Sequence, residues 1–189
     1  MTLLKCACVA MLAVGSSAAF ANEYDADLRK IAMSQISDWV ASPEVVTAVQ
    51  DQNARTMSLS QEDVDALDAT WRAQTVSGGE LIDSVLGNSL SQFLKSVKQQ
   101  GQGQFTEIFV SDIRGLNVGQ SDVTSDYWQG DEAKWQVPHE TSDLHISDIE
   151  FDESTQSYQS QVSLPILHEG AFIGVITVGV DLDRLAALH

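Results

Sequence analysis

The chain has 189 residues, of which 27 are acidic and 10 basic, and its net charge at pH 7 is −17 with the histidines neutral. This charge argues against nucleic acid and anionic lipid as binding partners, because both are themselves densely negative. It favours cationic ligands, divalent metals or a basic partner surface, although acidic residues also keep a secreted protein soluble.

The first 21 residues have the pattern of a secretory signal peptide. Lys5 precedes an apolar run, and the small residues Ala19 and Ala21 precede a cleavage site before Asn22. The run is too short and too rich in alanine and serine for a membrane-spanning helix, which needs about 20 strongly apolar residues. An uncleaved anchor is the alternative. We expect residues 22–189 to form a single domain that is exported to the periplasm.

Both cysteines, Cys6 and Cys8, fall inside the predicted signal peptide. The mature chain would then have no thiol, which excludes disulfides, thiolate metal sites and cysteine nucleophiles. Export together with the lack of cysteine indicates a bacterial periplasmic protein.

The first half of the mature chain has apolar residues at the spacing of amphipathic helices. Ser42 and Pro43 are typical of an N-cap and a first helical residue, and Ser60 with Asp63 forms a weak capping-box pattern. Gly78 and Gly79 are expected to end the helix that begins at Ser60. The predicted helices cover residues 25–40, 43–50, 60–74 and 86–97, and the last ends in the flexible stretch 99–104.

After Gly103 the apolar period changes from 3.6 to 2, which predicts a sheet. Five strands are expected, over residues 105–113, 116–122, 144–151, 158–166 and 171–180. The last strand is apolar on both faces and is therefore placed in the centre of the sheet. Helices followed by strands predict an α+β fold, with N-terminal helices packed on a five-stranded antiparallel sheet.

Several stretches in this order resemble the Cache domains, the extracytoplasmic PAS-like (PDC) sensors of bacterial chemoreceptors and histidine kinases. They are a long N-terminal helix, "SDIRGLNVGQSD", "TSDYWQGDEAKW" and a closing "GAFIGVITVGVDLDRL". The resemblance covers nearly the whole mature chain and implies one PAS-like unit with long N-terminal helices. In Cache receptors this unit is followed by a transmembrane helix and signalling domains. Here the sequence ends at His189, directly after the unit, so we expect a solitary form.

Cache pockets lie on the concave face of the sheet, beneath the segment between the second and third strands, which here is residues 124–136. The resemblance implies ligand contacts from residues of this segment and of the sheet: Asp126, Tyr127, Trp128, Trp135, Asp181, Phe109 and Tyr158. Aromatic rings can wall a pocket and stack on a cation. The rings could equally pack in the core, and the carboxylates of Asp126, Asp131 and Glu132 could cap a helix.

Asp181 matches the acidic position with which amine- and amino-acid-binding Cache domains hold an ammonium group. It could equally cap a short helix that begins near Leu182. The arginine with which those relatives clamp a carboxylate is replaced by Ala133, and Lys134 is expected to point elsewhere and lacks a bidentate fork. The resemblance therefore implies an amine or another cationic metabolite as the ligand.

Other kinds of site have little support in the sequence. The acidic run over residues 143–152 lacks the spacing of a calcium loop and reads as a solvated strand edge. The four histidines show no paired metal-binding spacing, and the sequence has no nucleophile-elbow motif. We expect no metal, no cofactor and no enzymatic activity.

The sequence therefore predicts a periplasmic small-molecule sensor that signals through a separate membrane-bound receptor or kinase. In receptor relatives the N-terminal helices pair two protomers, so a homodimer through Leu28, Ile31 and Trp39 is a hypothesis. Two alternatives remain open: a structural or adaptor protein whose pocket is filled by its own side chains, and an unrecognised periplasmic hydrolase.

Overall fold

The computed structural model describes residues 22–153 and 155–187. The predicted signal peptide and both cysteines lie outside these residues. The helical part consists of α1 (Asp25–Ile31), the π-helix η1 (Ala32–Ile36), α2 (Ser37–Val40), α3 (Pro43–Thr56), α4 (Gln61–Ser77), α5 (Glu80–Gly87) and α6 (Ser89–Gln100). It is followed by β1 (Phe105–Asp112), β2 (Asn117–Gln120), α7 (Ala133–Thr141), β3 (His145–Ile146), β4 (Glu150–Asp152), β5 (Ser157–His168), β6 (Ala171–Asp181) and α8 (Leu182–Ala186).

Two of the predicted helix starts are confirmed, and each is fixed by a short polar side chain. Ser42 caps α3 by accepting a hydrogen bond from the backbone N–H of Val45, with Pro43 at the first helical position. Ser60 and Asp63 form a reciprocal capping box at the start of α4. The helix predicted over 86–97 is interrupted, because Asn88 caps a new helix, α6, immediately after α5.

The described strands form one antiparallel sheet in the order β2-β1-β6-β5-β3, and β4 also pairs with β5. The α+β class and the central place of the last strand are confirmed. The strand expected over 144–151 is instead two short strands, β3 and β4. The hydroxyl of Ser147 accepts the hydrogen bond from the N–H of Gln161, so a side chain replaces a backbone carbonyl where the ladder breaks.

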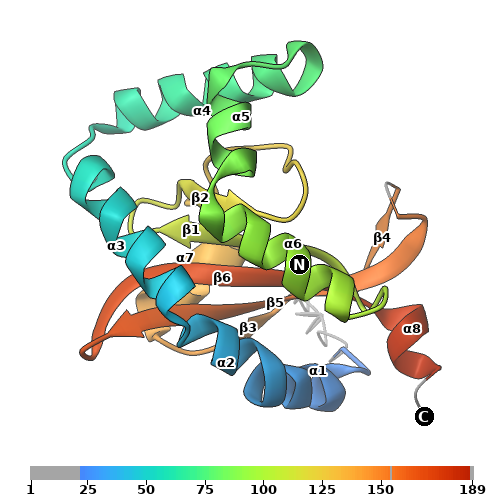
Figure 1. Ribbon diagram of the computed structural model, residues 1–189. Helices are drawn as coiled ribbons and strands as arrows, with labels where there is room; N and C mark the ends of the chain where they lie inside the picture. The colour runs from blue at the N-terminus through green and yellow to red at the C-terminus, as the bar shows by residue number, and fades with distance from the viewer. Residues whose placement is uncertain (1–21, 154, 188–189) are drawn as a thin grey trace, which may run out of the picture.

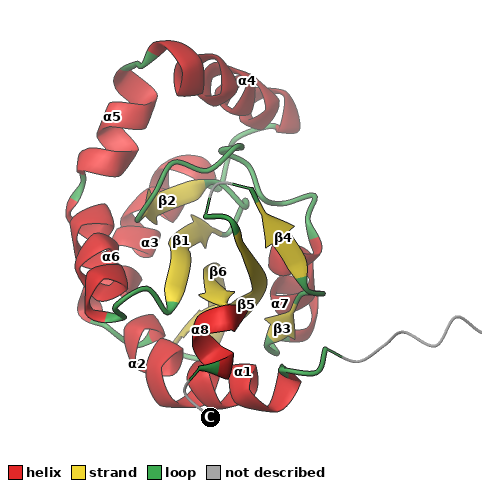
Figure 2. Ribbon diagram, turned by 90° about the vertical axis from the view of Figure 1, so that its right-hand side faces the viewer, coloured by secondary structure: helices red, strands yellow, loops and turns green. Residues whose placement is uncertain are grey.

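Helices cover both faces of the sheet (Figures 1 and 2). Figure 1 shows α3 and α6 in front of the sheet and α7 behind it. The main core lies between α1–α3, α6 and the near face, where Ile108, Val162, Ile176 and Val178 are fully buried. The opposite face, which α7 covers, is called the α7 face below.

The hypothesis of a homodimer through the apolar stripe of the first helix is wrong for two of its three residues. Leu28 and Ile31 are buried in the main core of their own chain. The indole of Trp39 packs edge-on against the ring of Phe105 at 5.2 Å, although Trp39 remains partly exposed. These side chains stabilise the domain itself, since an N-terminal helix needs an apolar face to pack on the sheet.

Helices α4 and α5 project from one end of the sheet (Figure 1). They pack on the connection that follows β2 through a second apolar cluster. Its buried members are Val64, Trp71, Ile82, Val85, Leu116 and Tyr127. This cluster joins the helical projection to the segment that precedes α7.

Candidate functional site

The segment over residues 124–136 is mostly an irregular loop rather than a helix. Helix α7 begins only at Ala133, so Trp128 lies outside it and does not share a helix face with Trp135. Gly130 allows this path because a methyl group there would lie 2.8 Å from the indole Cε2 of Trp128. The two indoles therefore belong to different parts of the molecule.

The first half of the segment packs against α4. The ring of Tyr127 stacks on Trp71 at 5.3 Å, and burial raises the pKa of Tyr127 to about 12. The indole N–H of Trp128 donates to the backbone oxygen of Arg114 at 2.8 Å, and Asp126 forms a 3.0 Å ion pair with Arg72. Tyr127, Trp128 and Asp126 thus contact the helical projection, and among the described residues no hydrogen bond, ion pair or ring contact joins them to the α7 face.

Asp68 holds this part of the segment in place. Its buried carboxylate accepts hydrogen bonds from the backbone N–H groups of Tyr127 and Trp128, at 2.8 and 3.0 Å, and pairs with Arg72. A buried carboxylate with two backbone donors and a guanidinium fixes the position of the loop.

Trp135 and Phe109 both lie on the α7 side of the sheet. Trp135 is buried, and its indole N–H donates to the backbone oxygen of Asp112 at the end of β1 at 3.1 Å. His139 stacks on the same indole at 4.4 Å. Helix α7 is thereby fastened to the sheet at the edge of the surface on which Phe109 lies.

A row of polar side chains crosses the α7 face, on strands whose other residues are mostly apolar. Residues paired across an antiparallel sheet point to the same side, and the register joins Phe109 to Thr177, Thr177 to Ser163, and Ser163 to His145. The hydroxyls of Ser163 and Thr177 lie 3.0 Å apart. Burial lowers the pKa of His145, against the opposing effect of Asp148.

A second row on this face contains Glu107 on β1, Gly179 on β6 and Gln161 on β5. Burial raises the pKa of the Glu107 carboxyl, while a hydrogen bond from Gln161 and the charge of Lys134 act in the opposite direction. Neighbouring side chains approach Gly179 closely, because a methyl group there would collide with Thr106 and lie 3.0 Å from Glu107 Cγ.

Lys134 corrects one expectation from the sequence. Its side chain points toward the sheet, is only 15% exposed, and places Nζ 5.5 Å from the centre of the Phe109 ring. The same Nζ forms a 2.9 Å ion pair with the carboxylate of Glu132. The α7 face therefore has the half-buried carboxyl of Glu107 and one nearby ammonium group.

Asp181 caps helix α8 and also lies at the edge of the α7 face. Its Oδ1 accepts a 2.9 Å hydrogen bond from the N–H of Arg184, and its other carboxylate oxygen has no hydrogen-bond partner among the described residues. Alternation along β6 places Asp181 on the same side as Gly179 and Thr177. Capping leaves the second oxygen available to a ligand.

Tyr158 lies away from this group. Alternation along β5 places it on the side of Ser160 and Val162, which the N-terminal helices cover, and its side chain is 53% exposed against Phe151. Of the residues predicted to contact a ligand, the structure thus places Phe109, Trp135 and Asp181 on the same face.

Four polar residues of the α7 face were missed by the sequence analysis: Glu107, Gln161, Ser163 and Thr177. A signal was present, because each strand residue is polar at an alternate position of an apolar strand. Within residues 22–153 and 155–187, no group of three or more acidic or histidine side chains is arranged to hold a metal ion. In the same residues no helix is both long and apolar enough to cross a membrane.

Residues 83–187 match the family model described as "Methyl-accepting chemotaxis protein-like, first PDC sensor domain". The chain belongs to this family of PDC sensor domains. The match covers more than half of the chain, including α6, the whole sheet and α7. The resemblance to Cache domains is thereby confirmed. Proteins of this family act as ligand-binding modules of sensors.

Solved structures with the same fold include the extracellular domain of the putative histidine kinase vpHK1S-Z8. It is 14% identical, covers 88% of this chain and 56% of its own, and has a TM-score of 0.51. The ligand-binding domain of the Campylobacter jejuni chemoreceptor Tlp3 with 4-methylisoleucine is 12% identical over 78% of this chain and 64% of its own, with a TM-score of 0.42.

An extracellular ligand-binding receptor from Desulfohalobium retbaense is 18% identical and covers 76% of this chain, with a TM-score of 0.41. The PDC sensor domain spans only 25% of that receptor chain, and at most about two thirds of the three solved chains named here. No curated protein sequence is similar enough to this chain to count as a relative.

Proposed function

We propose that this PDC sensor domain is a non-enzymatic periplasmic module that binds a small metabolite on the α7 face and passes the signal to a separate membrane-bound receptor or kinase. The observation that carries the proposal is the polar group on an otherwise apolar sheet, centred on the half-buried Glu107. A carboxyl group in this position costs stability unless a partner compensates it. A ligand ammonium group is such a partner.

The ligand class expected from the sequence, an amine or another cationic metabolite, fits Glu107 and the free oxygen of Asp181. The ring of Phe109 and the indole of Trp135 supply apolar walls on the same face. Ligand sites commonly combine apolar walls with a few polar groups that orient the ligand.

Lys134 favours a second candidate, a zwitterion that also carries a carboxylate. An ammonium ligand without a negative group would be repelled by Lys134 Nζ, which lies on the same face. A ligand carboxylate would instead replace Glu132 as its partner. Lysine acts here as a point charge, without the bidentate geometry of arginine.

Binding would act on α7, because this helix covers the polar face and is fastened to it through Trp135. A ligand carboxylate that binds Lys134 would break its ion pair with Glu132 and shift α7 relative to the sheet. A partner protein that binds α7 would respond to this shift. The outer surface of α7 is the part of the molecule that such a change presents to a receptor.

The test is a thermal-shift and calorimetric titration of the wild-type chain with putrescine, which has no carboxylate, and with L-alanine, which carries both charges. We expect a rise in Tm with at least one class and loss of binding in Glu107→Gln. Glu140→Gln, an exposed carboxylate on α7, is the matched control and should bind normally. A wider amine and amino-acid library that raises the Tm of neither protein would favour the adaptor alternative.

The hydrolase alternative makes a different prediction. If the chain cleaved generic ester or glycoside substrates and Asp181→Ala abolished this turnover, the sensor proposal would be wrong.

A further inference from the structure

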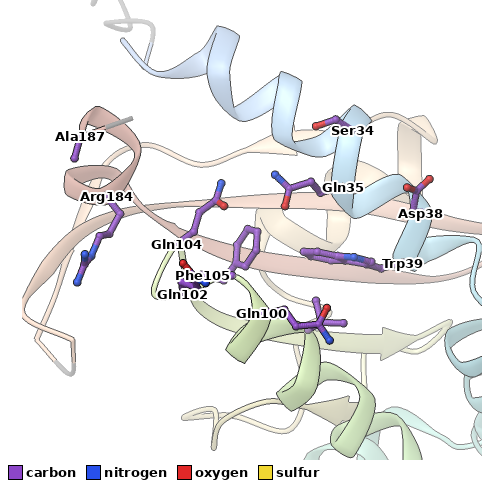
Figure 3. A pocket seen from close by; sticks show the side chains of 12 residues that line it. Ser34, Gln35, Asp38, Trp39, Gln100, Gln102, Gln104, Phe105, Arg184 and Ala187 are labelled. Atoms are coloured by element: carbon purple, nitrogen blue, oxygen red, sulfur yellow. The ribbon is translucent and has the colours of Figure 1, made fainter. Parts of the chain in front are cut away.

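A hollow lies on the opposite side of the sheet from the α7 face. It is an open groove of about 620 Å³ between η1 and α2, the turn after α6, and α8 (Figure 3). Its volume falls in the range of about 300–1,000 Å³ that is usual for small-molecule sites. Its lining is Ser34, Gln35, Asp38, Trp39, Val97, Gln100, Gly101, Gln102, Gln104, Phe105, Arg184 and Ala187.

The glutamines of the groove differ from the other glutamines of the molecule. Every other buried or half-buried glutamine in the described residues has a side-chain hydrogen bond: Gln52, Gln74, Gln120, Gln129, Gln159 and Gln161. Gln35 and Gln104 are also half-buried, yet their amides bond to no described residue. Both amides face the open groove and have their donor and acceptor groups free for a ligand.

The ends of the groove carry opposite charges. Figure 3 shows Asp38 beside Trp39 at one end, Arg184 at the other, and Gln35 and Gln104 between them. Neither Asp38 nor the guanidinium of Arg184 forms an ion pair with a described residue, and the indole N–H of Trp39 donates to none. A carboxylate beside an indole suits an ammonium group, and a guanidinium suits a carboxylate.

The backbone around the groove is held in unusual conformations. Gln35 lies in the π-helix η1, a form that is rare in proteins and frequent at functional sites. Gln102 adopts a left-handed conformation with φ of 50° in the turn that leads to Gln104. Both devices place a glutamine side chain at the rim or floor of the same groove.

We propose that this groove binds a short peptide. Its ammonium terminus lies at Asp38 and Trp39, its carboxylate terminus lies at Arg184, and its peptide groups exchange hydrogen bonds with Gln35 and Gln104. A primary amide offers both a donor and an acceptor, as a peptide group does. A saccharide would use the glutamines and the indole but would leave the opposite charges at the two ends without a role.

The indole N–H groups supply a reporter for each region in a nitrogen-15 NMR spectrum. The chain has four tryptophans, and the indole N–H groups of Trp71, Trp128 and Trp135 are bonded to backbone oxygens. Titration with triglycine should shift the Trp39 signal and leave the Trp135 signal in place. The variant Trp39→Phe assigns the signal by removing it.

Variants and modified probes make the test specific. The double variant Gln35→Ala, Gln104→Ala should weaken triglycine binding about tenfold or more, whereas Gln92→Ala, an exposed glutamine on α6, should leave it unchanged. Triglycine that is acetylated and amidated should bind at least about tenfold more weakly, since both terminal charges are lost.

The proposal is overturned if triglycine does not move the Trp39 signal, if the doubly blocked peptide binds as well, or if maltotriose binds where triglycine does not. These results do not test the proposed site on the α7 face, which lies on the other side of the sheet. The variant Glu107→Gln should lose binding on the α7 face and still bind triglycine in the groove.

Discussion

Gln161 on β5 donates a 2.8 Å hydrogen bond to Glu107 on β1, although strand β6 lies between them. The two side chains meet above Gly179, which is paired with both residues and has no side chain to separate them. The glycine thus allows a half-buried carboxyl and an amide to meet on the α7 face. Replacing any one of the three residues tests a different part of the site.

Gly179→Ala should destabilise the fold and abolish ligand binding on the α7 face. The added methyl group would collide with Thr106 and press on Glu107, and overpacking of this kind costs about 1–3 kcal/mol. Chemical unfolding measures the loss. Gly87→Ala is the control, because a methyl group at this helical position has no neighbour within 4 Å and should be neutral or slightly stabilising. Equal stability of Gly179→Ala and wild type would contradict the close approach.

Glu107→Gln should stabilise the unliganded domain at neutral pH while it abolishes binding. Burial raises the pKa of Glu107 in the folded state, so the folded chain holds this proton more tightly than the unfolded chain does. Above the folded pKa the ionised carboxyl costs stability. The glutamine removes that cost and can still accept the hydrogen bond from Gln161, for a gain of about 1 kcal/mol.

The pH dependence of this gain is the sharper part of the test. As the pH falls through the folded pKa and then below the ordinary glutamate value of 4.5, wild-type Glu107 becomes neutral in both states and the difference between the proteins should vanish. Free energies of unfolding measured across this range report the trend. A wild-type chain more stable than Glu107→Gln at pH 7 without ligand would show that the carboxylate is compensated within the protein itself.

Asp181→Ser and Asp181→Ala separate the two roles of this residue. Serine can still accept the hydrogen bond from Arg184 and cap α8, whereas alanine should cost about 1 kcal/mol. Thermal unfolding is therefore expected to distinguish the two variants. Binding titrations should show the same loss of affinity in both, because each removes the free carboxylate oxygen. Normal binding by Asp181→Ser would leave capping as the function of Asp181.

Asp68→Ala should loosen the segment before α7 more than it affects the sheet. It leaves the backbone N–H groups of Tyr127 and Trp128 without their acceptor, at a cost of about 1–3 kcal/mol. Hydrogen exchange should accelerate at these two amides. Asp68→Asn keeps an oxygen at the position and should retain most of the protection; similar exchange in the two variants would contradict this role of Asp68.

Local sequence signals predicted much of the fold correctly. Ser42, Pro43 and the pair Ser60 and Asp63 marked helix starts because caps depend on only a few neighbouring residues. The break between β3 and β4 was not predictable from apolar alternation, since it depends on a hydrogen bond from Gln161 to the hydroxyl of Ser147, 14 residues away.

The candidate site was predicted only in part for the same reason. The aromatic segment pointed to the correct region, but which ring lies where depends on long-range contacts: Tyr127 with Trp71 in α4, and Trp135 with Asp112 in β1. Lys134 was assigned the wrong direction because its orientation depends on how α7 packs on the sheet, which places its Nζ over the ring of Phe109.

A crystal structure of the domain with whichever of putrescine or L-alanine binds tests the central claim most directly. The account predicts ligand density between α7 and strands β1, β6 and β5, with its ammonium group in hydrogen-bond contact with Glu107. Ligand density elsewhere would contradict the account. So would an α7 face that is filled by the domain's own side chains, with Glu107 and Lys134 directly paired.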